Sequence, residues 1–468
     1  MNLNAAFQTL HAASRAAPLD LAARRTALTA LSLALQTHAK QACAVIDADF
    51  QGRHADETML LELSPSQQGI KHALKHLTSW AAPRKAGVGI HFLPAKNRII
   101  PQPLGVVGIV VPWNYPIYLT IGPMISALAA GNRVMVKTSE HTPQTGLWLA
   151  NTLHACLGAD VCQVVQGDAQ EDPVALSQAF CALPFDHLVF TGATALGPSV
   201  MAAAAKHLTP VTLELGGKSP AIVGAGADIA NAARRIAVGK WRHAGQTCIA
   251  PDYVLVHRSQ YQPLIDALLA QAAKLYPDAL NNPAYSSIIN QRQFARLQAW
   301  ADEAREQGAA IHSHGALSDA SRHRMAPAVV TGALDSMKLT CQEIFGPLLP
   351  VLPFDDLNQA IDCVNQRDRP LALYIFERSA ADIATVLART VAGGVSVNET
   401  IVHITQETLP FGGVGASGMG HYHGRWGFDA FSKLKPVFYQ SRWNGLGLLD
   451  PPHSKLFYTM VKHLTGTQ

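Results

Sequence analysis

Residues 105–137 read GVVGIVVPWNYPIYLTIGPMISALAAGNRVMVK. Two short apolar runs, Val106–Val111 and Arg133–Lys137, enclose a segment with helical periodicity, Ile121–Ala130. Buried strands that alternate with helices are typical of a parallel sheet whose two faces are covered. The stretch therefore predicts one unit of an α/β fold.

The same stretch has the apolar character of a membrane span, since no charged residue occurs from Ile99 to Asn132. A transmembrane helix needs about 20 apolar residues without interruption. Proline breaks a helix interior, and this run is interrupted by Pro101, Pro103, Pro112, Pro116 and Pro123. The sequence therefore favours a buried strand, loop and helix, and we expect no membrane partner.

The alternation of strands and helices continues along the chain. Further apolar runs lie at Val161–Val165, His187–Phe190 and Val211–Leu215, and helical periods lie at Thr142–Leu157 and Pro198–Leu208. The second half repeats the pattern. We therefore expect an α/β protein with two parallel-sheet domains that face each other.

The pattern also gives domain boundaries. We expect residues 1–81 and 102–213 to form the first domain, and residues 214–412 to form the second. The segments 82–101 and 428–468 fit neither domain well. We expect them to form an arm and a C-terminal tail that dock on another subunit.

The composition excludes several classes of protein. The 468 residues are 48% apolar, and a net charge of +4 is too dilute for a nucleic-acid surface. The 20 histidines are scattered, so we predict no metal site. The seven cysteines form no CxxC pair and the N-terminus resembles no secretory signal, which indicates free thiols and a cytoplasmic protein.

Three fragments carry candidate catalytic groups. Cys248 ends a Gly-Gln-Thr-Cys turn, where nearby backbone N–H groups favour a thiolate; its alternative is a core cysteine. Glu214 lies in the apolar run LEL, either as a general base or as a buried carboxylate held by backbone donors or Lys218. Asn114, in PWNYP, either donates to an oxyanion or satisfies its own loop.

A fourth fragment, FTGATALG at 190–197, predicts a strand, a turn at Gly192 and a helix. It is neither a GxGxxG fingerprint nor a P-loop. A helix N-terminus after a strand nevertheless favours a phosphate group. The fragment alone is a weak indication of a nucleotide site.

Taken together, the fragments resemble the NAD(P)-dependent aldehyde dehydrogenase superfamily from about residue 20 to 440. The ordered motifs are PWNYP, VKTSE, FTGATALG, LELGGKSP, GQTC, EIFGP and LPFGGVGASGMG. Within the superfamily the chain is similar to the short class 3 branch, and further to the coniferyl aldehyde dehydrogenase group. The motifs for that group are APDYVLV, YSSIIN, RPLALYIF and GMGHYHG.

The resemblance implies a Rossmann-like cofactor domain, a second parallel α/β catalytic domain and a small oligomerisation arm, in a homodimer. It implies oxidation of an aldehyde to a carboxylic acid with NAD, or with NADP as the alternative cofactor. Cys248 would be the nucleophile and Glu214 the base that activates the deacylating water. Asn114 and the Cys248 backbone N–H would form the oxyanion hole.

The resemblance also implies a cofactor site formed by Trp113, Lys137, Glu140, Gly192, Glu343 and Phe345. Lys137 and Glu140 would hold the adenosine ribose, and Gly192 with the following helix would receive the pyrophosphate. Glu343 would bind the nicotinamide ribose and Phe345 would contact the nicotinamide. Because the Glu140 carboxylate repels a 2′-phosphate, we expect a modest preference for NAD over NADP.

Four positions depart from the family's usual pattern: Thr138, Ala193, His243 and Gln342. Ala193 removes a hydroxyl near the phosphate site, and we expect weaker or reshaped pyrophosphate binding. His243 lies close enough to the nucleophile to alter the local field. None of the four removes a catalytic group.

Several alternatives remain open at the level of sequence. Release of the acyl group by coenzyme A is disfavoured because Glu214 can activate water, and a non-catalytic protein of the same fold is disfavoured because all three catalytic groups are intact.

The substrate is expected to be an aromatic aldehyde, such as a coniferyl-type one, or a medium-chain aliphatic one; a semialdehyde is the alternative. Tyr115, Tyr118 and Trp241 either line an apolar tunnel or pack in the core.

Overall fold

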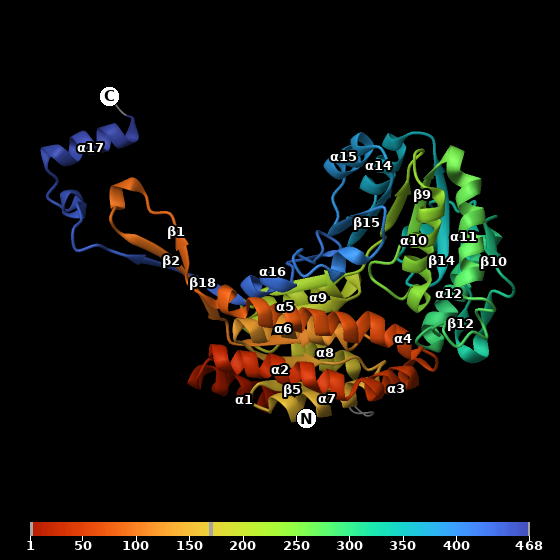
Figure 1. The fold of residues 1–468 in the computed structure, drawn as a ribbon, viewed down its shortest axis with the longest axis horizontal. Coiled ribbons are helices and arrows are strands. Elements are labelled where there is room, and N and C mark those ends of the chain that lie inside the picture. The colour runs from red at the N-terminus through yellow and green to blue at the C-terminus, as the bar shows by residue number, and fades with distance from the viewer. Residues whose placement is uncertain (1–2, 168–171, 467–468) are drawn as a thin grey trace.

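A computed structural model describes residues 3–167 and 172–466. The chain forms two lobes and a projecting arm (Figure 1). A six-stranded sheet lies in the lower lobe of that view and a seven-stranded sheet in the upper right-hand lobe. Both sheets are largely parallel, which confirms the expected α/β fold class.

The first sheet has the strand order β17-β7-β6-β3-β4-β5. Its strands are β3 (Val106–Val110), β4 (Arg133–Lys137), β5 (Cys162–Val165), β6 (His187–Gly192), β7 (Val211–Leu215) and β17 (Gly418–Met419). The helices that connect its parallel strands are α6 (Tyr118–Ala130), α7 (Pro143–Leu157), α8 (Pro173–Cys181) and α9 (Gly197–Ala205). The five strands expected from the apolar runs are therefore confirmed, with end points shifted by at most two residues.

The order of these strands explains where a ligand can bind. The chain runs from β3 outward to β4 and β5, then returns to the other side of β3 for β6 and β7. The loops that follow β3 and β6 therefore diverge at the carboxyl edge of the sheet. Ligands of doubly wound sheets bind in the crevice at such a switch point.

Most of the uncharged stretch lies in the core, whereas its first residues, 99–104, are only partly buried or exposed. Every residue of β3 and α6 is buried, and Pro123 lies inside α6. A helix that is apolar on all sides is stable when other elements surround it. Among the described residues, no helix is both long and apolar enough to span a bilayer.

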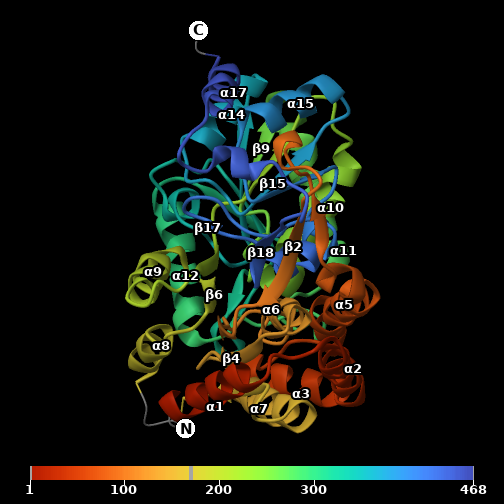
Figure 2. The ribbon, with the colours of Figure 1, turned by 90° about the vertical axis from the view of Figure 1, so that its left-hand side faces the viewer.

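Helices from the N-terminus pack around the lower lobe. They are α1 (Leu3–Ala16), α2 (Leu21–Thr37), α3 (Ala39–Phe50), α4 (Ala55–Thr58) and α5 (Ser64–Ala81). Helices α1, α2 and α3 lie at the base of the molecule, and α5 lies above them beside α6 (Figure 2). A short π-helix, Met59–Leu63, joins α4 to α5. These helices contribute side chains to the region behind the loop that follows β3.

The second sheet has the order β10-β13-β14-β9-β8-β15-β16, and β10 is its antiparallel edge. Its strands are β8 (Pro220–Val223), β9 (Tyr253–His257), β10 (Ala310–Ser313), β13 (Ala328–Thr331), β14 (Leu348–Phe354), β15 (Ala372–Phe376) and β16 (Gly394–Val397). Its helices are α10 (Ile229–Trp241), α11 (Tyr261–Leu275), α12 (Gln291–Glu306), α13 (Lys338–Cys341), α14 (Leu357–Asn365) and α15 (Ala380–Arg389). The chain crosses between the sheets at residues 216–219, just beyond the expected boundary at 214.

The two segments that fitted neither domain pair with each other. β2 (Lys96–Pro103) lies between β1 (Arg84–Ala86) and β18 (Ser432–Tyr439) in an antiparallel sheet. The C-terminal helix α17 (Lys455–Thr465) has no buried side chain and lies beyond this sheet, away from both lobes (Figure 1). The short helix α16 (Gly424–Ala430) connects the arm to the body.

Asn132 joins the base of the arm to the first sheet. Its buried side-chain oxygen accepts hydrogen bonds from the backbone N–H groups of Leu104 (2.7 Å) and Gly105 (2.9 Å). Its amide nitrogen donates to the carbonyl oxygens of Ala127 (3.2 Å) and Phe431 (2.8 Å). One side chain therefore fixes segments that are far apart in the sequence.

We expect Asn132→Leu to lower the midpoint of thermal unfolding by about 5 °C or more. Each buried polar group that loses its partner costs about 1–3 kcal/mol, and 1 kcal/mol shifts the midpoint of a large domain by about 2–4 °C. Asn365→Leu is the control, because the exposed Asn365 side chain donates a single hydrogen bond within the described residues, to the carbonyl oxygen of Arg389. Equal midpoints for the two variants would contradict this structural role of Asn132.

Candidate active site

The nine residues predicted from the sequence line one cavity of about 510 Å³ between the two lobes. They are Trp113, Asn114, Lys137, Glu140, Gly192, Glu214, Cys248, Glu343 and Phe345. The loops after β3, β4, β6 and β7 supply one wall, and segments of the second lobe supply the other. Tertiary structure therefore brings together residues that the sequence spreads over more than 230 positions.

The thiol and the carboxylate meet at the seam between the lobes. The Cys248 Sγ donates a hydrogen bond of 3.2 Å to Glu214 Oε1. Glu214 is buried on β7, whereas Cys248 follows α10 and the short turn 242–245. The alternative partner for Glu214 is not used, because Lys218 donates instead to Asp252 Oδ2 at 2.6 Å.

Burial sets the protonation of both groups. It raises the pKa of Glu214, although three side-chain hydrogen bonds oppose the shift. Burial, together with the charge of Glu214, raises the pKa of the Cys248 thiol well above its ordinary value. The thiol therefore holds its proton in this arrangement, and the carboxylate that accepts the hydrogen bond is placed to take that proton.

Asn114 lines the same cavity as the thiol, in the loop between β3 and α6. It is buried, and its Nδ2 donates to the carbonyl oxygen of Gln246 at 3.1 Å. An amide nitrogen carries two hydrogens, so one of them remains for a second acceptor. A nucleophilic thiol, a base and an amide donor together can attack a carbonyl carbon and stabilise the resulting oxyanion.

The far end of the cavity carries the charged residues predicted for a ribose. Lys137, at the end of β4, donates to Glu140 Oε2 at 3.4 Å. Burial opposes ionisation of Glu140, but its own backbone amide and Lys137 outweigh burial and lower its pKa. Glu140 is therefore ionised at neutral pH and can accept hydrogen bonds from sugar hydroxyls.

Glycines keep the middle of the cavity open. A Cβ on Gly216 would lie 2.0 Å from Glu343 Oε2, so only glycine lets the Glu343 carboxylate come this close to the backbone at position 216. Burial raises the pKa of Glu343 to about 8. Gly192 and Ala193 lie at the end of β6, where a tight turn leads into α9. Gly192, Ala193 and Gly216 all line the cavity, where such small residues leave the backbone accessible to a ligand.

Trp113 and Phe345 line the cavity, whereas Tyr115 and Tyr118 are not among its lining residues. Trp113 and Phe345 contact edge to face, with ring centroids 5.4 Å apart. The Tyr115 hydroxyl is 2.6 Å from Thr247 Oγ1, one residue before the nucleophile. Tyr118 contacts His423 Nε2 at 3.2 Å.

Trp241 does not belong to this group of rings. It is fully buried, and its indole N–H donates to the carbonyl oxygen of Pro347 at 2.9 Å. Of the two alternatives given by the sequence for this residue, the structure supports core packing. Its aromatic character alone could not distinguish a tunnel wall from a core side chain.

His243 contributes a dipole to the site rather than a charge. Its ring is fully buried against Phe50 and Tyr115. Burial, aided by the nearby Arg53 cation, lowers the pKa of His243 well below its ordinary value. The departure from the usual asparagine therefore adds no positive charge beside the nucleophile at neutral pH.

Sequence reasoning missed two groups of residues. Tyr422 and Thr191 both donate to Glu214 Oε2, at 3.1 and 3.2 Å. Arg292, Gln293 and Arg296 extend from the start of α12 into the cavity wall. The quoted motif GMGHYHG contains Tyr422, but nothing in it indicates a contact with a carboxylate 208 positions earlier.

Comparisons with known proteins show the family of this chain. The model of the aldehyde dehydrogenase family matches residues 2–437. A probable coniferyl aldehyde dehydrogenase from Pseudomonas aeruginosa is 46% identical over 99% of this chain and 96% of its own length. Aldehyde dehydrogenase family 3 member H1 of Arabidopsis thaliana is 38% identical over 95% of this chain and 90% of its own.

Solved structures give the same result. Staphylococcus aureus AldH, in a substrate-bound state, matches with a TM-score of 0.93 and 33% identity over 99% of this chain and 100% of its own. An aldehyde dehydrogenase from Bacillus cereus, in complex with NAD⁺, matches with a TM-score of 0.84 and 25% identity over 94% and 89%. The resemblance read from the motifs is confirmed, and the chain belongs to the aldehyde dehydrogenase family.

Proposed function

We propose that this NAD(P)-dependent aldehyde dehydrogenase works through a thioester on Cys248 that water resolves with help from Glu214. The observation that carries the proposal is the 3.2 Å hydrogen bond from Sγ to Glu214 Oε1, in the cavity that Asn114 also lines. Assays with NAD⁺ and a panel of aldehydes, with and without coenzyme A, test it. Acid formation independent of coenzyme A is the expected result.

In the first half-reaction Glu214 takes the thiol proton, and the thiolate attacks the aldehyde carbon. The carbonyl oxygen gains negative charge and accepts hydrogen bonds from Asn114 Nδ2 and the Cys248 backbone N–H. Such fixed donors stabilise the transition state more than the substrate. Bound NAD(P)⁺ supplies a hydride acceptor, and loss of hydride leaves a thioester on the sulfur.

In the second half-reaction Glu214, which has by then released the thiol proton to solvent, acts on water. A carboxylate whose pKa is raised by burial can take a proton from a water molecule directed at the thioester. The new C–O bond forms as the C–S bond breaks, and the acid leaves with the thiol restored. Tyr422 and Thr191 hold the carboxylate oxygen that does not contact the thiol.

For the substrate we favour an aromatic aldehyde of the cinnamyl type, with medium-chain aliphatic aldehydes second. Tyr115 and Tyr118 place aromatic surface near the thiol, and several of the similar proteins are coniferyl aldehyde dehydrogenases. A ranking of kcat/KM for a cinnamaldehyde, hexanal and succinic semialdehyde tests this choice. The highest value for the semialdehyde would contradict it.

The cytoplasm is the proposed location. All seven cysteines lie in the described part of the chain, and all are free thiols. Free thiols persist in a reducing compartment. Fractionation of the source cells tests this location.

We further propose a homodimer held by the arm. The arm and tail expose large apolar side chains, including Phe438, Tyr439 and Trp443, the last with 85% of its surface accessible. Apolar patches of this kind mark protein interfaces. Sedimentation should give a dimer for the native chain and a monomer for Phe438→Asp/Trp443→Asp. A native monomer would contradict the proposal.

The two half-reactions predict different defects in two variants. Cys248→Ala should abolish dehydrogenase and any esterase activity, because no thioester forms. Glu214→Gln should give a single burst of reduced cofactor that is slower than the native burst, because the thiol loses its proton acceptor. Turnover after the burst should also be slow, since hydrolysis lacks its base. In the native chain the burst rate should rise with pH, because the raised pKa of Cys248 keeps the thiol protonated at lower pH. Full steady-state activity in either variant would disprove these roles.

Glu140 should set the choice between cofactors. Its ionised carboxylate accepts hydrogen bonds from ribose hydroxyls and repels a 2′-phosphate, whereas Lys137 neutralises part of that repulsion. We therefore expect a modest preference for NAD⁺ in kcat/KM, and a shift towards NADP⁺ in Glu140→Gln. A native preference for NADP⁺, or an unchanged ratio in the variant, would contradict this placement of the ribose.

A further inference from the structure

A buried ion pair lies behind the loop that carries Asn114. Arg53 Nη1 and Glu62 Oε1 are 2.7 Å apart, and both side chains are fully buried. Neither lines the cavity. Within the described residues, Arg53 Nε and Nη2 have no hydrogen-bond partner. Such a pair is often no more stable than an apolar pair of similar volume, so stability alone does not explain it.

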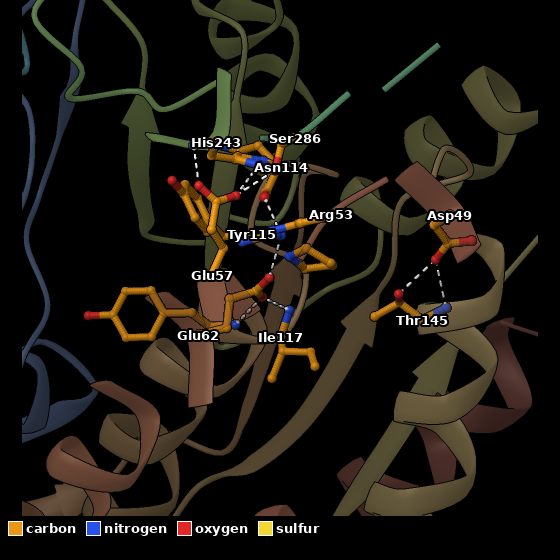
Figure 3. Close-up of polar contacts among 12 residues, drawn as sticks. Asp49, Arg53, Glu57, Glu62, Asn114, Tyr115, Ile117, Thr145, His243 and Ser286 are labelled. Atoms are coloured by element: carbon orange, nitrogen blue, oxygen red, sulfur yellow. Dashed lines mark hydrogen bonds and ion pairs between the residues drawn. The ribbon is translucent and has the colours of Figure 1, made fainter. Parts of the chain in front are cut away.

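We call residues 114–118 the Asn114 loop. The ion pair bonds the backbone at both ends of this segment (Figure 3). Arg53 Nη1 also donates to the backbone carbonyl oxygen of Asn114 at 3.2 Å. Glu62 Oε2 accepts from the backbone N–H groups of Ile117 (2.7 Å) and Tyr118 (3.1 Å). Glu62 therefore caps the start of α6, where a carboxylate also meets the favourable end of the helix dipole.

The guanidinium also supports the middle of the loop. Its central carbon lies 5.1 Å from the centroid of the Tyr115 ring and 5.4 Å from that of Phe50. The backbone N–H of Arg53 donates to Asp47 Oδ1 at 2.8 Å, which fixes the turn that carries the side chain. The N-terminal helices thus hold residues 114–118 from behind without entering the cavity.

We propose that Arg53 and Glu62 are positioning residues that hold the Asn114 amide where the oxyanion forms. This inference rests on the proposed function, in which Asn114 stabilises that charge. Preorganised donors are effective only in the right place, and a displacement of about 1 Å can cost about 100-fold in rate. Arg53 bonds the backbone of Asn114 itself, so its loss should move the amide directly.

The test is the rate of the first burst of reduced cofactor at saturating NAD⁺. Arg53→Met/Glu62→Gln removes both charges but keeps an oxygen that can cap α6. We expect its burst rate to fall about 10- to 100-fold, with the dissociation constant for NAD⁺ unchanged within about twofold. In an Asn114→Ala background the same two substitutions should cause no further loss, because the pair acts through Asn114.

Asp49→Asn is the matched control. Asp49 caps α7 through the backbone N–H groups of Gln144 (3.0 Å) and Thr145 (2.8 Å), and it does not contact the Asn114 loop (Figure 3). The Asp49→Asn variant should therefore keep the native burst rate. If the double variant does not fold, Arg53→Lys replaces it, since an ammonium lacks the planar fork of the guanidinium.

A native burst rate in the folded double variant would overturn the proposal. So would a loss in the Asn114→Ala background as large as the loss that the two substitutions cause in the native chain. A fall in NAD⁺ affinity of the same size as the rate loss would also overturn it. Cys248→Ala separates this outcome from failure of the proposed function. If that variant keeps a burst, the thioester mechanism itself is wrong; if it loses the burst and the double variant does not, only the positioning role fails.

Discussion

The hydrogen bond between the Cys248 thiol and the Glu214 carboxylate depends on how the two lobes meet. Glu214 lies on a strand of the first sheet, and Cys248 follows a helix of the second lobe. The chain crosses between the sheets directly after Glu214, through Gly216 and Gly217. Glycine at 216 lets Glu343 approach from the other lobe. The thiol and the carboxylate therefore meet only when both lobes are folded and packed against each other.

The rest of the site follows from the order of strands in the first sheet. The loops after β3 and β6 diverge at the switch point, which opens the crevice for a dinucleotide. Asn114 lies on the first of these loops and Gly192 begins the second. Loops of this kind need support from behind, and the Arg53–Glu62 pair supplies it to the loop of Asn114.

Particular residues show why part of the site was predictable. Glu214 was predicted as a functional residue because a carboxylate is rare in an apolar strand. Cys248 was predicted because its turn presents a thiol. Both properties are local. Tyr422 was missed because its contact with Glu214 spans 208 positions. Trp241 was ambiguous because a tunnel wall and a core use the same aromatic residues, and only burial distinguishes them.

The sequence by itself determined the order of strands and helices, the buried character of the uncharged stretch and the chemical groups of the site. These follow from hydrophobic periodicity and from local turns, which need no knowledge of distant contacts. Only the tertiary structure decided which groups meet: Arg53 with Glu62, Tyr422 with Glu214, and the arm segments with each other. The physical reason is that such pairs depend on how whole elements pack, and short-range patterns carry no information on that packing.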